Sequence, residues 1–138
     1  MQEVVLDTNV LVAALRSKRG ASYRLVRLIG KGNWRLNISV ALALEYEDVL
    51  KRTDVLPGYN EAEVDELWDY LFSVSNLVSF VLRRRPSLRD PDDERILEVA
   101  AQCRAMIITH NTRDFVGVER FGVSVKTPAE FLKILGER

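Results

Sequence analysis

Near the N-terminus the chain reads Val4-Val5-Leu6-Asp7-Thr8-Asn9-Val10-Leu11, in which three polar residues separate two apolar runs. A short continuous apolar run is typical of a strand buried on both faces, and the polar residues that follow are common where a helix begins. The pattern predicts a strand over 4–6 and a helix over 8–12 that can extend to 17. It also leaves Asp7 at the point where the strand ends.

The same alternation of strands and helices continues along the chain. Further apolar runs resemble buried strands at Leu36–Ser39, Leu77–Val81, Met106–Thr109 and Val123–Val125. Helical patterns lie between these runs, at about 20–31, 40–52, 60–75, 91–104 and 127–135. Short strands separated by helices predict an α/β fold, with a parallel sheet of about five strands that is covered on both faces.

Local signals mark the starts of three of these helices. Asn60 with Glu63 matches the capping-box pattern. Asp90-Pro91 matches an N-cap followed by proline at the first helical position, and Thr127-Pro128 repeats that signal.

Composition places the chain among globular proteins of one domain. Its 138 residues, 47% of them hydrophobic, are sufficient for a core, and we expect a single domain over 1–138. The single Cys103 excludes an intrachain disulfide and fits a reducing compartment. No apolar run approaches the roughly 20 residues that span a bilayer, and the N-terminus is strand-like rather than signal-like. A cytoplasmic protein is therefore expected.

Net charge gives no general attraction to nucleic acid, because Lys plus Arg and Asp plus Glu both number 20. Any such binding has to come from local basic patches, and on charge alone a solvated loop is the favoured explanation for them. The patches are Arg16, Lys18 and Arg19, and then Arg83, Arg84, Arg85 and Arg89.

Three carboxylates are predicted to point inward. Asp7 ends a buried strand, Glu45 shares a helix face with Leu42, and Asp93 shares one with Leu97. A carboxylate taken out of water costs several kcal/mol unless a proton, a basic partner or a metal neutralises it. Three such groups from distant segments predict one divalent-cation site and phosphoester hydrolysis. A side chain that reaches the surface or pairs with an arginine is the alternative for Glu45.

The remaining polar residues near these acids have simpler explanations. Asp90 and Asp92 fit an N-cap and a favourable charge at a helix N-terminus. Asp7 could itself be a helix cap, since Asp, Thr and Asn all cap helices, but Thr8 and Asn9 could cap the first helix while Asp7 faces the metal. Asp114 is the candidate fourth carboxylate, and for His110 a surface or core-edge role is favoured over a catalytic one.

Taken in order, these segments resemble the PIN-domain nucleases, in particular the bacterial VapC-like toxins of VapBC toxin–antitoxin pairs. The resemblance covers essentially the whole chain and depends on the order and spacing of its segments. The segments are Val5–Val12, Glu45–Leu50, Arg89–Asp93 with Leu97 and Ala100, Ile108-Thr109 and Thr127–Leu132. It implies a three-layer α/β/α sandwich and a metal-dependent ribonuclease.

The resemblance also implies roles for individual residues. The family acids correspond to Asp7, Glu45 and Asp93, and Asp90 resembles the additional aspartate of this branch, as a support or a further ligand. Many relatives have Asp two residues after the threonine that corresponds to Thr109, where this chain has Asn111. Other PIN toxins combine Asn there with a later Asp-Phe, so Asp114 is expected to supply the missing charge.

Oxygen ligands without a histidine or cysteine cluster favour Mg²⁺ or Mn²⁺. We expect Asp7 and Asp93 to be the main ligands, and Glu45 to act through water or to orient the attacking water. The supporting residues are expected to be Thr8, Asn9, Thr109 and Asn111. The candidates for RNA phosphate contacts are Arg16, Lys18, Arg19, Arg85 and Arg113, with Arg83 and Arg84 beside Arg85.

Two other functions stay open on the sequence. Asn111 motivates a PIN-fold protein- or RNA-binding module in which catalysis is weakened or lost. A phosphatase with a strand-end Asp-x-Asp nucleophile is disfavoured, because the second acid of that motif is Asn9 here. The family resemblance further implies a small antitoxin partner, which could insert an arginine among the carboxylates, and a homodimer.

Overall fold

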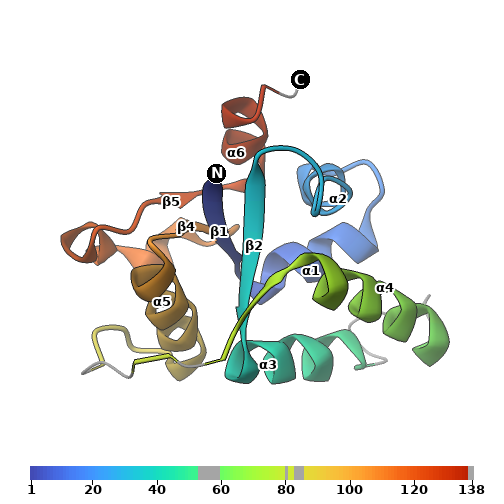
Figure 1. The fold of residues 1–138 in the computed structure, drawn as a ribbon, viewed down its shortest axis with the longest axis horizontal. Helices are drawn as coiled ribbons and strands as arrows, with labels where there is room; N and C mark the ends of the chain where they lie inside the picture. The colour runs from blue at the N-terminus through green and yellow to red at the C-terminus, as the bar shows by residue number, and fades with distance from the viewer. Residues whose placement is uncertain (53–59, 80, 83–85, 137–138) are drawn as a thin grey trace.

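The computed structural model describes residues 1–52, 60–79, 81–82 and 86–136. Its centre is a five-stranded sheet in the order β3-β2-β1-β4-β5, in which every pair of neighbours is parallel (Figure 1). The strands are β1 (Gln2–Leu6), β2 (Trp34–Ser39), β3 (Asn76–Val78), β4 (Met106–Ile108) and β5 (Val125–Lys126). The predicted parallel α/β fold is therefore confirmed.

Helices cover both faces of the sheet. The helices are α1 (Thr8–Arg16), α2 (Ala21–Val26), α3 (Val40–Leu50), α4 (Glu61–Val74), α5 (Pro91–Cys103) and α6 (Pro128–Ile134). Figure 1 shows α5 on one side of the sheet and α1, α2 and α4 on the other. This division follows from the strand order, because right-handed crossovers from β1 to β2 to β3 place their helices on one face and the return to β4 places α5 opposite.

The predicted helix starts are present. Asn60 and Glu63 form a complete capping box, and the Asp90 side chain accepts a hydrogen bond from the Asp92 backbone N–H ahead of Pro91. Thr127 caps α6 and forms a second complete capping box with Glu130. Each cap satisfies backbone N–H groups that the first turn of a helix leaves unpaired.

Several boundaries differ from the predictions. The helix expected over 20–31 ends at Val26, and hydrogen-bonded turns continue to Lys31. Gly30 has φ +85° there, and a Cβ on it would lie 3.0 Å from the Val74 Cβ, so only glycine suits the position. The third strand ends at Val78 rather than at residue 81.

Two short 3₁₀ helices between β4 and β5 were not predicted. They are η1 (Thr112–Phe115) and η2 (Val118–Phe121). Their buried residues, Phe115 and Val118, anchor this connection to the core.

The core lies on both faces of β1. Val4, Val5 and Leu6 are fully buried, as expected for the central strand of a parallel sheet. No helix among the described residues is long and apolar enough to cross a membrane.

Candidate functional site

A hollow of about 660 Å³ lies at the carboxyl ends of the central strands. This acidic hollow collects residues from α1, α3, the start of α5 and η1, which are far apart in the sequence. Its lining residues are Asp7, Thr8, Asn9, Val12, Ala13, Arg16, Ser17, Glu45, Val49, Asp90, Asp92, Asp93, Asn111 and Asp114. The structure therefore brings together every acid that the sequence proposed for the site.

Asp7 stands between the last residue of β1 and the first residue of α1. It occupies the N-cap position of α1, so the prediction that Thr8 or Asn9 caps this helix was wrong. Its side chain makes no capping hydrogen bond; its Oδ2 instead accepts from the Thr109 Oγ1 at 2.7 Å and from the Asn9 Nδ2 at 3.3 Å. The carboxylate is thus held toward the hollow, and burial raises its pKa above the ordinary value.

Thr109 links the ends of β1 and β4 at this point. Its side chain is fully buried, and its Oγ1 accepts from the Asn9 Nδ2 at 3.4 Å and from the Asn111 backbone N–H at 3.0 Å. The Asn9 Oδ1 accepts from the His110 backbone N–H at 3.3 Å. This network fixes the orientation of Asp7 without placing a second charge beside it.

Glu45 enters the hollow from α3 and is only partly buried. The Thr8 Oγ1 donates to its Oε2 at 3.2 Å. The neighbouring Tyr46 is fully buried, and its hydroxyl donates to the Leu6 backbone carbonyl, which fixes α3 against the end of β1. Because Tyr46 follows Glu45 and Leu6 precedes Asp7, this one hydrogen bond helps to position both acids.

The charge of Glu45 is poorly compensated. Burial, followed by the nearby Asp92 carboxylate, raises the pKa of Glu45 to about 7. Asp92 itself forms an ion pair with Arg95 at 2.7 Å, between its Oδ1 and the Arg95 Nη1. Sequence analysis assigned Asp92 only a favourable charge at a helix N-terminus, because that position explains an acidic residue without any further contact.

Asp93 shows the same effect at the start of α5. Burial, and then the charges of Asp7, Asp90 and Asp114, raise the pKa of Asp93 to about 7. Several carboxylates thus lie near enough to repel one another in a partly buried space. Such a group stays unfavourable at neutral pH until protons or a cation reduce its charge.

The chemistry of this donor set fits a hard divalent cation. The side-chain donors of the hollow are oxygens and amides, and neither histidine nor cysteine lines it within the described part of the chain. The described residues contain no group of three or more Asp, Glu, His or Cys side chains already arranged to hold one ion. Binding would therefore require small side-chain movements or water ligands, both usual for Mg²⁺.

The predicted basic residues are distributed unevenly around the hollow. Arg16 lines it, whereas Lys18, Arg19 and Arg113 are exposed. Arg85, with its neighbours at 83 and 84, lies outside the described residues.

Two other polar contacts were missed by sequence reasoning. Glu94 is 7% exposed, and its Oε2 accepts from the backbone N–H groups of Ser87 at 3.1 Å and Leu88 at 2.9 Å. Its position three residues before Leu97 on the helix was an available signal. The Ser22 Oγ lies 2.6 Å from the His110 Nε2, which gives His110 a structural contact with α2. Ser22 carries no sequence signal for that pairing.

A separate hollow of about 480 Å³ lies between α3, β3 and the start of α5. It contains Glu94, Arg89 and Arg95 but none of the acids predicted for catalysis. The Asp92–Arg95 ion pair joins a residue of the acidic hollow to a residue of this one.

The sequence profile of the PIN domain matches residues 3–113. The chain belongs to the PIN-domain family. PIN domains are generally nucleases and typically bind divalent metal ions. The match spans β1 through the start of η1, and so includes Asp7, Glu45 and Asp93.

Solved structures support the same fold for this PIN domain. VapBC2 from Rickettsia felis, bound to a DNA fragment from its promoter, superposes with a TM-score of 0.63 at 16% identity, covering 91% of this chain and 98% of that one. VapBC-1 from nontypeable Haemophilus influenzae gives a TM-score of 0.63 at 17% identity, covering 93% and 99%. No curated protein matches the chain significantly.

Proposed function

We propose that this PIN domain is a divalent-cation-dependent endoribonuclease and the toxin of a toxin–antitoxin pair. The observation that carries the proposal is the convergence of Asp7, Glu45 and Asp93 in one hollow. Burial and repulsion by nearby carboxylates raise the pKa of each of these carboxyl groups. A site that is unfavourable without a cation, at the carboxyl ends of parallel strands, is what metal-assisted hydrolysis needs.

Asp7 and Asp93 would hold Mg²⁺ or Mn²⁺, with Asp90 as a further ligand or support. When bound, the cation supplies charge stabilisation at the scissile phosphate and lowers the pKa of water. Glu45 would orient the attacking water and accept its proton, since Thr8 fixes one of its oxygens. Asp114 would provide the fourth carboxylate.

Neighbouring uncharged groups would keep these carboxylates in place. Thr109 and Asn9 donate to Asp7, and Asn111 donates its backbone N–H to Thr109. Because these donors add no positive charge, they would orient Asp7 and leave its charge available to a cation.

An RNA phosphate would approach an acidic surface, so nearby cations are needed as well. Arg16 lines the hollow and would contact phosphate there. Lys18, Arg19, Arg113 and Arg85 are the further candidates at its margins. Contacts of this kind give affinity without sequence choice.

Cleavage of a structured RNA by wild type and by Asp7→Asn, in Mg²⁺ and in Mn²⁺, tests the proposal. Asp7→Asn should lower the rate by at least about 100-fold, since it removes a ligand charge from the site. Glu47→Gln is the matched control, because Glu47 lies on the same helix as Glu45 but pairs with Lys51 outside the hollow. Equal rates for wild type and Asp7→Asn in both metals would overturn the proposal.

A PIN-fold binding module is the second candidate. It is favoured by Asn111, which stands where many relatives have an aspartate. Tight RNA or protein binding without cleavage, unchanged by Asp7→Asn, would identify this function instead.

The toxin assignment adds two predictions about partners in the cytoplasm. The solved neighbours are VapBC proteins, which supports a small antitoxin that would cover the acidic hollow. Exposed apolar residues on α3, Val40 and Leu44, support a protein contact such as a homodimer. Co-purification from the native operon and light scattering test these predictions. Recovery of an unbound, harmless monomer would count against both.

A further inference from the structure

A hollow of about 320 Å³ lies between α2, the turn that follows it and α6. Four of its lining residues are cations, Lys18, Arg24, Arg27 and Lys31. None of its lining residues within the described part of the chain is acidic. In a chain with no net charge, this basic hollow is a local concentration of positive charge rather than part of a general excess.

Three of the four cations in this basic hollow are available to a ligand. Lys18, Arg27 and Lys31 are exposed, and none of them forms an ion pair with another described residue. The Arg27 guanidinium lies 5.7 Å from the centre of the Tyr23 ring, a contact that orients it on the hollow wall. Cations gathered in a concave surface focus the electrostatic field and attract anions.

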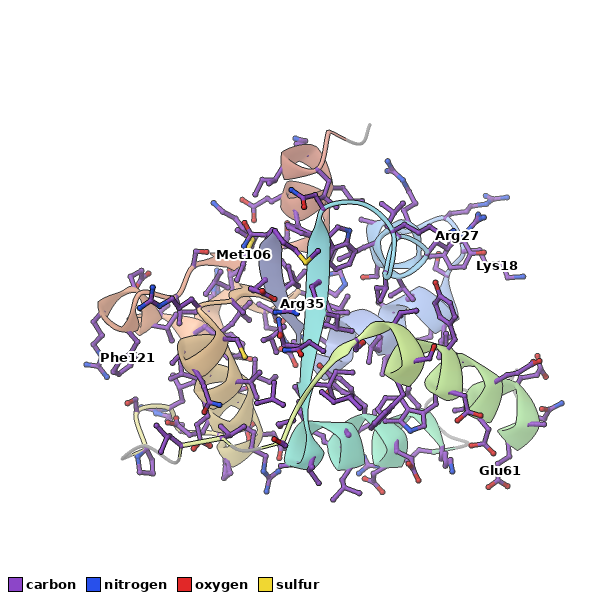
Figure 2. The ribbon with its side chains drawn as sticks, in the orientation of Figure 1. Lys18, Arg27, Arg35, Glu61, Met106 and Phe121 are labelled. Carbon is purple, nitrogen blue, oxygen red and sulfur yellow. The ribbon has the colours of Figure 1, made fainter. Side chains whose placement is uncertain are left out.

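The basic hollow adjoins the acidic one at the end of α1. Arg16 and Ser17 line the acidic hollow, and Lys18 lines the basic hollow. Because consecutive Cα atoms are about 3.8 Å apart, the Cα atoms of Arg16 and Lys18 lie within about 7.6 Å of each other. Figure 2 shows Lys18 and Arg27 together at the α2 side of the molecule.

We propose that the basic hollow binds backbone phosphates of a single-stranded RNA whose scissile phosphate lies in the acidic hollow. That the bound strand is RNA rests on the proposed nuclease function. A strand that passes the end of α1 would place neighbouring phosphates among Lys18, Arg27 and Lys31. These phosphates would offset the mutual repulsion of the cations and hold the strand against the repulsion of the acidic hollow.

The test compares two variants with the same change in charge. Arg27→Gln/Lys31→Gln removes two cations from the basic hollow. Arg104→Gln/Arg120→Gln removes two exposed cations that line neither hollow. Figure 2 places Phe121, the neighbour of Arg120, at the end of the molecule opposite Arg27.

Binding of a labelled single-stranded RNA of about 16 nucleotides is measured by anisotropy in EDTA over a range of salt concentrations. Each lost phosphate contact lowers the slope of log affinity against log salt by about 0.7, so the first variant should lower it by about 1.4 and the control should not. An unchanged slope, an equal loss in the control, or tighter binding of duplex DNA of the same length would overturn the proposal.

Cleavage separates this proposal from the nuclease proposal. With Mn²⁺, the first variant should raise KM for the long RNA and leave kcat unchanged, and a substrate of about 4 nucleotides should be unaffected. If the wild type cleaves RNA but Arg27→Gln/Lys31→Gln has an unchanged salt slope, RNA binding in the basic hollow is refuted and the nuclease proposal stands. If the variant lowers the salt slope but the wild type does not cleave RNA, the nuclease proposal is refuted and RNA binding in the basic hollow stands.

Discussion

Thr109 determines how Asp7 is presented. Its hydroxyl donates to the Asp7 Oδ2 at 2.7 Å and accepts from Asn9 and Asn111, all in a fully buried position. A neutral donor of this kind orients a carboxylate and leaves its negative charge to attract a cation. Removing the Thr109 hydroxyl therefore tests whether the orientation of Asp7 matters for cation binding.

Thr109→Val keeps the shape of the side chain and removes the hydroxyl. We expect the metal concentration for half-maximal cleavage to rise about 10- to 100-fold, the usual effect of losing a group that orients a ligand. Thr127→Val is the control, since it removes the α6 cap at a cost of about 1 kcal/mol and lies outside the acidic hollow. Unchanged metal dependence in Thr109→Val would show that this hydroxyl does not orient Asp7 for a cation.

Glu45 and Asp93 should make the stability of the cation-free protein depend on pH. Burial and neighbouring carboxylates raise the pKa of each to about 7. In the unfolded chain both titrate near pH 4, so between about pH 4 and pH 7 the folded state holds more protons. The free energy of unfolding should therefore fall as the pH rises through that window.

Denaturant unfolding in EDTA at pH 5 and pH 8 measures the effect. We expect a loss on the order of 1–2 kcal/mol, after allowing for solvent screening of these partly exposed groups. Mn²⁺ should restore stability at pH 8 and have little effect at pH 5. Asp93→Asn should reduce the pH difference, and greater stability of the wild type at pH 8 than at pH 5 would contradict this assignment.

Helical periodicity identified Glu45 and Asp93 as acids on the apolar faces of their helices. Asp93 lies on the apolar stripe of its helix, where an apolar side chain would have served packing equally well. Asp92 was not identified, because a charge at a helix N-terminus is common and its approach to Glu45 depends on how α3 and α5 meet. The spacing of residues along the sequence does not predict a contact of this kind between two helices.

Among the elements, the segment that leads into α5 is held against that helix by the buried Glu94 carboxylate. The Glu94 Oε2 accepts backbone N–H groups from Ser87 and Leu88, ahead of the Asp90 cap. Its Oε1 is buried and has no hydrogen-bond partner among the described residues. One oxygen of this carboxylate therefore satisfies two backbone donors.

Glu94→Ala should lower the free energy of unfolding by about 1–3 kcal/mol, because it leaves two backbone donors without their partner. Glu94→Gln keeps one acceptor oxygen and should lose less. Glu66→Ala, at an exposed position of α4, should stay within about 0.5 kcal/mol of wild type. Guanidinium unfolding midpoints measure all three, and equal stability of Glu94→Ala and Glu66→Ala would show that the contact is dispensable.

Element boundaries were predictable where a capping signal is local. The starts of α4, α5 and α6 depend on side chains within three residues, and all three were located from sequence. The helix expected over 20–31 ends at Val26 instead, and Gly30, in the turn that follows, lies against Val74 of α4, a contact that no local motif marks. The 3₁₀ helices follow from burial of Phe115 and Val118, which tertiary packing decides.

For the whole molecule, the strand order explains why distant acids meet. β1 is central and parallel to both of its neighbours, so the residues after β1, β2 and β4 emerge at one edge of the sheet. Asp7, α3 with Glu45, and Thr109 follow those three strands directly. Alternating strands and helices predicted this edge, whereas the basic hollow joins α2 to α6 and has no sequence motif.

Anomalous diffraction from crystals soaked in Mn²⁺ shows whether the acidic hollow binds a divalent cation. We predict a manganese peak in the acidic hollow, within about 2.1 Å of carboxylate oxygens of Asp7 and Asp93. The same soak of Asp93→Asn should weaken or abolish the peak. If saturating Mn²⁺ leaves the hollow of the wild type empty, or binds only at acids outside it, Asp7 and Asp93 do not form a metal site.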